Sequence, residues 1–251
     1  MSAGLMSVSV RKIGAYALFC CDCAVSTLQH GVRWNRVMEE GHKLGVKAFP
    51  VLAVMAVFVG TNLAIQGFTA FRQLGAGSLL GMFVALAGVR EVCPILAATM
   101  IAAKGGTEMT AQLAVMNTKE QIDALEVMAV DPRAELVAPS VFAIMLVLPA
   151  LTIIAVAFSI GAAYLVAVHQ LHVGSGDFLY HCLGNFRIYD LWVGLLKACV
   201  FGIVIASVSG YFGFHSERGP AGVGRSTNQA VVAMCVVCVS LNFLLSAIAY
   251  G

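Results

Sequence analysis

The sequence predicts an all-α integral membrane protein with about five transmembrane helices. Of its 251 residues, 60% are hydrophobic and only 11% are charged, whereas soluble domains carry about 25% charged residues. So few charges could not cover the surface of a water-soluble globule of this size. The formal net charge of +2 forms no concentrated basic patch, so we expect no binding to nucleic acid.

Five stretches with few or no charges are long enough to cross the bilayer, because a helix needs about 20 mostly apolar residues to span roughly 30 Å of hydrocarbon. We expect the spans at about residues 49–66, 79–103, 136–168, 191–214 and 227–250. Residues 48–251 are therefore predicted to form a transmembrane domain. It follows a cytoplasmic or interfacial N-terminal segment, residues 1–47.

The basic residues predict the orientation of these spans. With the N-terminus inside, eleven Lys and Arg residues lie in the inner segments and only Arg72 and Arg187 in the outer loops. Lys and Arg collect on the cytoplasmic side of membrane proteins. The sequence therefore predicts a cytoplasmic N-terminus and a C-terminus on the opposite side of the membrane.

An apolar stretch over residues 13–28 precedes the first span. It is shorter than a span, contains Asp22, and has Arg11 and Lys12 before it and Arg33 and Arg36 after it. These features favour an amphipathic helix that lies in the cytoplasmic interface. A sixth crossing is the alternative, and it would move the N-terminus to the outer side.

The second span carries two charged residues, Arg90 and Glu91, near its middle. A charge there costs about 2.5–3.5 kcal/mol, so such residues usually face a protein interior or a wet cavity. Pro94 has no N–H, which frees the carbonyl of Arg90 and predicts a helix kink. Two interpretations stay open: Arg90 binds the phosphate or carboxylate of a headgroup, or an ion pair joins two helices, with Glu91 paired to Lys197 or Lys104.

Asn62 and Gln66 lie one helical turn apart on the first span. Either they face the same polar site as Arg90, or they form a hydrogen bond between helices or mark the end of the span.

A charged stretch lies between the second and third spans. Four apolar residues in it follow helical spacing: Ile122, Leu125, Val127 and Met128. Thr118, with Gln121 three residues later, predicts a capping box, and Asp131 before Pro132 is expected to end the helix. We expect a short acidic amphipathic helix, which either docks into a groove of a soluble partner or is an ordinary solvated loop helix.

Motifs of catalysis and nucleotide binding are missing from the sequence. It contains no GxxxxGK[ST] phosphate loop, no HExxH motif and no GxSxG elbow, so we expect no ATP site, no metal site and no catalytic residue in this chain. Most of the eight cysteines lie in apolar runs, where thiols commonly serve as small hydrophobes. Cys182 is expected in an external loop.

Three motifs resemble those of one family, the MlaE/YrbE permeases of Mla- and Mce-type lipid ABC transporters. The longest covers residues 120–132 and reads EQIDALEVMAVDP. Residues 90–96, REVCPIL, and residues 222–227, GVGRST, are similar to two further motifs of that family. The three occur in the family's order, and the resemblance covers roughly residues 45–250.

The resemblance implies a homodimeric permease of the bacterial inner membrane that moves phospholipids or related lipids between that membrane and the cell envelope. It would pair with two copies of a cytoplasmic ATP-binding subunit, which would hold ATP and Mg²⁺, and with a periplasmic MCE-domain protein. This chain itself would bind no cofactor. In the family, the match to Arg90 and Glu91 lies by a lipid cavity built with the first span, which carries Asn62 and Gln66 here. The family's coupling helix, seated on the ATPase, corresponds to Glu120, Gln121, Ile122, Asp123, Ala124, Leu125 and Glu126.

Some positions depart from the family pattern. Lys104 and Gln112 stand where many relatives carry Arg and Glu, and Glu108 occupies a usually small position. Lys is not an equivalent bidentate donor to Arg, so a salt bridge is not carried over there. Neither the lipid species nor the direction of transport follows from the resemblance. The alternative function is a stand-alone secondary transporter or channel that uses Arg90 and Glu91.

Overall fold

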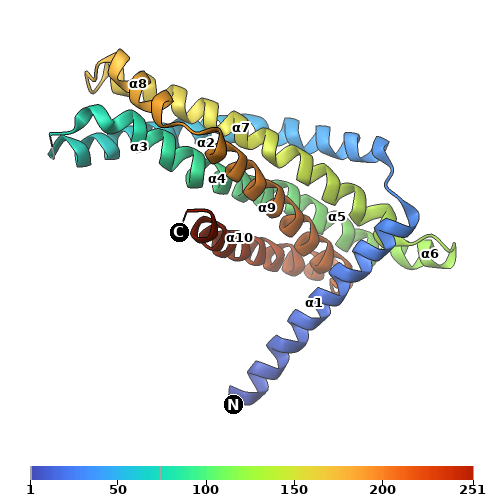
Figure 1. Cartoon of the computed structure of the whole chain (residues 1–251). Helices are drawn as coiled ribbons and strands as arrows, with labels where there is room; N and C mark the ends of the chain where they lie inside the picture. Colours follow the sequence, from blue (N-terminus) through green and yellow to red (C-terminus); the bar gives the residue numbers. More distant parts are fainter. Residues whose placement is uncertain (1, 74, 251) are drawn as a thin grey trace. The chain divides into compact units, whose positions relative to one another are not determined.

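A computed structural model describes residues 2–73 and 75–250, with the side chains of all of these except residues 2–13, 30, 78 and 185. The described residues are almost entirely helical and contain no strand (Figure 1). The side chains of Arg11 and Lys12, which the count of inner basic residues includes, lie outside the described side chains.

Five helical runs are long and apolar enough to cross a membrane, which confirms the predicted fold class. They are α2 (Trp34–Gln73), the run Leu80–Thr118, the run Arg133–His169, α9 (Ile188–Phe214) and α10 (Pro220–Tyr250). Each run is longer than the predicted span within it. The 40 residues of α2 extend about 60 Å at 1.5 Å per residue, about twice the thickness of the hydrocarbon. Helical structure therefore continues through polar ends that hydropathy assigns to loops.

The second run is interrupted twice by π-helical turns. It consists of α3 (Leu80–Ala87), η2 (Gly88–Val92), α4 (Cys93–Ile101), η3 (Ala102–Gly106) and α5 (Thr107–Thr118), of which η2 and η3 are π-helical. In a regular helix the ring of Pro94 would clash with the carbonyl of Arg90, four residues earlier. The wider turn of η2 ends at Val92, two residues before this proline, and turns of this kind are frequent at functional sites.

Four further elements of the described chain are shorter or less apolar than the five runs. These are α1 (Ser2–His30), η1 (Gly77–Leu79), α6 (Gln121–Val127) and α8 (Ser175–Asn185), while η4 (Arg133–Val137) and α7 (Ala138–His169) form the third run. Among the described residues, α1 is not a candidate span, in keeping with the expected interfacial helix. Cys182, expected in an external loop, lies between the third and fourth candidate spans, where the segment forms α8, and it is buried.

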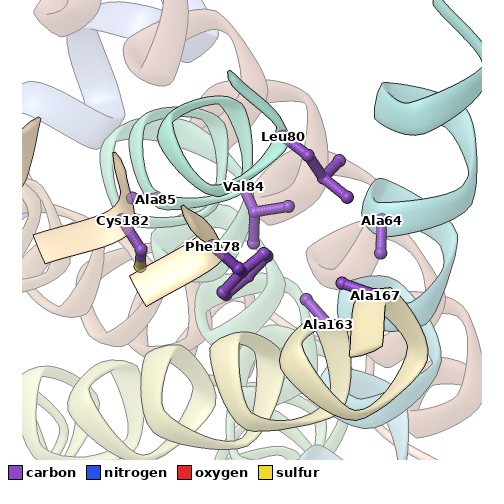
Figure 2. Close-up of a cluster of buried hydrophobic side chains, with 8 residues drawn as sticks. All are labelled: Ala64, Leu80, Val84, Ala85, Ala163, Ala167, Phe178 and Cys182. Atoms are coloured by element: carbon purple, nitrogen blue, oxygen red, sulfur yellow. The ribbon is translucent and has the colours of Figure 1, made fainter. Parts of the chain in front are cut away.

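The chain divides into two compact units. The first contains Met1–Lys43, Ala102–Ile144 and Ile203–Val236, and the second contains Leu44–Ile101, Met145–Gly202 and Val237–Gly251. Figure 2 shows a core cluster of the second unit, which consists of Ala64, Leu80, Val84, Ala85, Ala163, Ala167, Phe178 and Cys182. In this cluster the Phe178 ring of α8 lies among side chains of α2, α3 and α7 (Figure 2).

Glycine permits a close approach of helices in this core. A Cβ added at Gly81 of α3 would lie 2.3 Å from the carbonyl oxygen of Phe178 in α8. Because that neighbour is backbone, no side-chain rotation could relieve the clash. Small residues that let helix backbones approach are a usual feature of membrane-protein packing.

Candidate functional site

The guanidinium of Arg90, in η2, is held by a carboxylate from α9. Its Nε donates to Oδ1 of Asp190 at 2.9 Å, and its Nη2 donates to Oδ2 at 3.2 Å. The Asp190 side chain is only 2% exposed and that of Arg90 is 30% exposed. The Tyr250 ring of α10 lies 4.4 Å from Cζ of Arg90, within the range of a cation–π contact. A bidentate pair backed by an aromatic ring fixes the orientation of the charge as well as its position.

A second cation, Lys197 of α9, completes this arrangement. Its Nζ donates to the carbonyl oxygen of Arg90 at 2.8 Å and to Oγ of Ser246 at 2.7 Å, and the side chain is fully buried. The carbonyl that Pro94 deprives of its helical donor therefore receives a charged donor from another helix. We call Arg90, Asp190, Lys197, Ser246 and Tyr250 the Arg90 cluster.

The other residues expected at this polar site are not part of the Arg90 cluster. Glu91 is exposed. Its charge acts electrostatically on Lys197, but the hydrogen bonds of the Lys197 ammonium go to the Arg90 carbonyl and to Ser246. Nε2 of Gln66 donates to Oδ1 of Asn62 within α2. Both of these side chains are exposed, and in the described part of the chain neither is hydrogen-bonded to Arg90 or Glu91. Their role at a lipid cavity stays a prediction.

Sequence reasoning missed Asp190, Ser246 and Tyr250. The predicted fourth span, residues 191–214, begins one residue after Asp190. A signal was nevertheless present, since Asp190 and Lys197 are seven residues apart and therefore share one face of a helix. Ser246 and Tyr250 are likewise one turn apart on α10.

The start of α6 differs from the predicted capping box. Thr118 still belongs to α5, where its Oγ1 donates to the carbonyl of Ala114 at 2.9 Å. Glu120 occupies the N-cap position in the left-handed region, with φ 58°, and no side chain caps the helix there. The prediction that Thr118 caps this helix was wrong, because the turn between α5 and α6 is only two residues long.

The end of α6 also differs from the prediction. The helix ends at Val127, Ala129 has a left-handed φ of 57°, and the N–H of Val130 donates to the carbonyl of Leu125 at 3.0 Å. These features are those of a Schellman motif, which satisfies the last carbonyls of a helix.

Asp131 and Pro132 begin the third run instead of ending α6. Oδ1 of Asp131 accepts a hydrogen bond from the N–H of Arg133 at 2.9 Å. Asp is a preferred N-cap residue, and proline is favoured at the first helical position, where no N–H is needed. The dipeptide therefore begins the third run, whereas the sequence predicts that it ends the acidic helix.

The surface of α6 combines charge with exposed apolar side chains. Ile122 is 5% exposed and faces the protein, whereas Val127 is 87% exposed and Met128 is 64% exposed. The carboxylates of Glu120 and Asp123 both pair with Arg218. An acidic helix with an apolar tip is thus presented between two candidate spans.

The comparisons with known proteins cover both the Arg90 cluster and α6. The family model described as permease MlaE matches residues 37–248. The chain belongs to the MlaE permease family. The match includes Arg90, Asp190, Lys197 and all of α6.

Named relatives agree with this assignment. The intermembrane phospholipid transport system permease protein MlaE of Haemophilus influenzae is 31% identical over 242 residues, which cover 96% of this chain and 93% of that protein. A probable ABC transporter permease protein of Rickettsia typhi is 32% identical over 236 residues, 94% of this chain and 91% of the relative. A probable ABC transporter permease protein of Pyropia yezoensis is 34% identical over 215 residues, 86% and 82% of the two chains. The resemblance drawn from the three motifs is confirmed.

Proposed function

We propose that this chain is the membrane-spanning subunit of an ABC transporter that moves phospholipids, and that a separate ATP-binding protein drives it through α6. Membership of the MlaE permease family and similarity to a phospholipid transport permease support this function. The sequence has no phosphate-binding loop of its own, so the energy of ATP has to enter through another protein.

The observation that carries the proposal is the surface of α6. Val127 and Met128 are apolar and exposed, at 87% and 64%, beside an acidic helix that joins two candidate spans. Exposed apolar side chains on a short helix suit insertion into a groove of a partner. The distribution of Lys and Arg supports a cytoplasmic position for this helix, which is the side where ATP is available.

The lipid would contact polar groups exposed within the spans. Glu91, Asn62 and Gln66 are exposed, and polar residues within a span usually face a protein interior or a wet cavity. A second copy of the chain would enclose them in such a cavity, in a homodimer of the bacterial inner membrane. Arg90, which Asp190 orients and which keeps 30% of its side chain exposed, is our candidate for contact with the phosphate. An MCE-domain protein would join the complex on the periplasmic side.

Native mass spectrometry of the complex purified from its own membranes tests this function. We expect two copies of this chain, two copies of a protein with a phosphate-binding loop, and retained phospholipid. Val127→Asp places a charge on the exposed tip of α6 and should remove the ATP-binding protein. Asn35→Asp adds the same charge at an exposed position of α2 and should not.

Three results would count against the proposal. Retention of the ATP-binding protein by Val127→Asp at the level of Asn35→Asp would remove α6 as its docking site. A purified chain with neither phospholipid nor an ATP-binding partner would overturn the transporter assignment. Lipid or solute movement by this chain alone in proteoliposomes, driven by an ion gradient, would establish the secondary transporter instead.

A further inference from the structure

The loop between α9 and α10 is bound to the start of α6 through one arginine. Arg218 lies in this loop, and its Nη1 donates to Oε1 of Glu120 at 2.9 Å while its Nη2 donates to Oδ2 of Asp123 at 2.9 Å. A single guanidinium therefore holds two carboxylates, one on the residue before α6 and one in its first turn. All three residues belong to the first unit.

Neutral hydrogen bonds join the same loop to the end of α5. Nδ2 of Asn117 donates to the carbonyl oxygen of Phe214 at 3.3 Å and to that of Ser216 at 3.0 Å. The N–H of Gly219 donates to Oγ1 of Thr118 at 3.3 Å. The loop is thus attached to the α5–α6 turn on both sides of Arg218.

The packing of α6 by itself is slight. It is seven residues long, and Ile122 is its only buried residue in the described chain. Isolated helices of this length are unstable in water. The direction in which α6 points therefore depends on the bonds that tie it to its neighbours, and the two charge-assisted bonds of Arg218 are the ones that act on α6 from the α9–α10 loop.

We propose that Arg218 is a positioning residue that transmits the movement of a docked ATP-binding protein from α6 to the α9–α10 loop. This inference rests on the proposed function, because it requires a partner that moves α6. With Arg218 present, a displacement of α6 pulls on the loop through two directional bonds. Without it, α6 can follow its partner while α9 and α10 stay in place, and these two helices supply Asp190, Lys197, Ser246 and Tyr250 to the Arg90 cluster.

Loss of the Arg218 contact should uncouple ATP hydrolysis from lipid transport without unfolding the protein. The side chains of Arg218, Glu120 and Asp123 are each more than half exposed, at 58%, 65% and 54%, and exposed ion pairs contribute little to stability. Arg218 touches α6 on the loop side, while the proposed docking tip, Val127 and Met128, lies at the other end of the helix. Binding of the partner and transmission of its movement are therefore separable by mutation.

The test compares ATP hydrolysis with ATP-dependent lipid transfer in the reconstituted complex. In Arg218→Ala the ATP-binding protein should still co-purify and hydrolyse ATP, while the lipid transferred per ATP should fall about fivefold, the effect of losing two ion pairs of this exposure. Arg218→Asp combined with Asp123→Arg restores one of the two opposite-charge pairs, that between positions 218 and 123, and should recover part of the ratio. Lys43→Ala, which removes an exposed partner of Glu40 on α2, is the matched control and should leave it unchanged.

The outcomes separate this inference from the proposed function. An unchanged ratio of lipid to ATP in Arg218→Ala would overturn the inference, and so would a charge exchange that recovers no part of the ratio. Loss of the ATP-binding protein from Arg218→Ala would make Arg218 a docking residue and would also overturn it. If the wild-type complex contains no ATP-binding protein, the proposed function itself fails, whatever the variants do.

Discussion

Asp190→Asn should destabilise the protein, because it removes the buried counter-charge of Arg90. Asn keeps the shape of the side chain and one acceptor oxygen, but its NH₂ group would face a guanidinium that can only donate. One of the two bonds to Arg90, at 2.9 and 3.2 Å, would therefore be lost, and the remaining bond would no longer join two opposite charges.

The expected magnitude follows from the surroundings of the pair. Removing one partner of a fully buried pair costs about 3–5 kcal/mol, because a charge is left uncompensated. Arg90 is 30% exposed, and the contact with the Tyr250 ring, worth about 0.5–2 kcal/mol, would remain. We therefore expect a loss of about 2 kcal/mol in the free energy of unfolding, a value below that for a fully buried pair. For a chain of this size the loss corresponds to a decrease of about 4–8 °C in Tm.

Thermal unfolding in detergent, followed with a thiol-reactive fluorophore, measures this change. Cys93 and Cys238 are fully buried and react only as the protein unfolds. Glu39→Gln makes the same carboxylate-to-amide change at an exposed position of α2 and should leave Tm within about 1 °C, since surface substitutions are usually near neutral. The double variant Arg90→Met with Asp190→Leu removes both charges and should recover stability relative to Asp190→Asn.

Two results would refute this reasoning. Equal Tm values for Asp190→Asn and Glu39→Gln would mean that the ion pair contributes nothing to folding. A double variant that is less stable than Asp190→Asn would mean that the isolated charge is not the cause of the loss.

Two further predictions concern thiol reactivity and helix packing. Maleimide at pH 7 should label the exposed Cys21 and leave Cys182 unlabelled, because burial raises the pKa of the Cys182 thiol and only the thiolate reacts. Labelling of Cys182 in the folded protein should increase only as the pH rises above the ordinary range of a thiol. Equal labelling rates of the two cysteines at pH 7, measured by mass spectrometry, would contradict this prediction. Gly81→Ala should lower Tm, because its Cβ would lie 2.3 Å from a backbone oxygen; the expected loss in the free energy of unfolding is about 1–3 kcal/mol, the usual cost of overpacking. Gly161→Ala is the control and should be tolerated, because a Cβ at Gly161 would have no neighbour within 4 Å. Similar Tm values for the two variants would count against the close approach of α3 and α8.

The sequence alone was sufficient for the membrane fold, since hydropathy is a local property that each stretch carries by itself. The same holds for the existence of α6, because a charged stretch between two apolar spans is visible without a structure. The ends of α6 were not predictable in the same way. Thr118 and Asp131 are each compatible with two helices, and the tertiary structure decides which one they serve.

The partner of Arg90 was decided only by the tertiary structure. The sequence showed a charge in the membrane that needed compensation, yet Asp190 is 100 residues away, and a helical period gives the face of a residue but not the helix that it meets. The same reason hid the contact of Arg218 with α6, 98 and 95 residues away along the chain. Ion pairs depend on which helix faces pack together, and that choice is made by the whole set of helices at once.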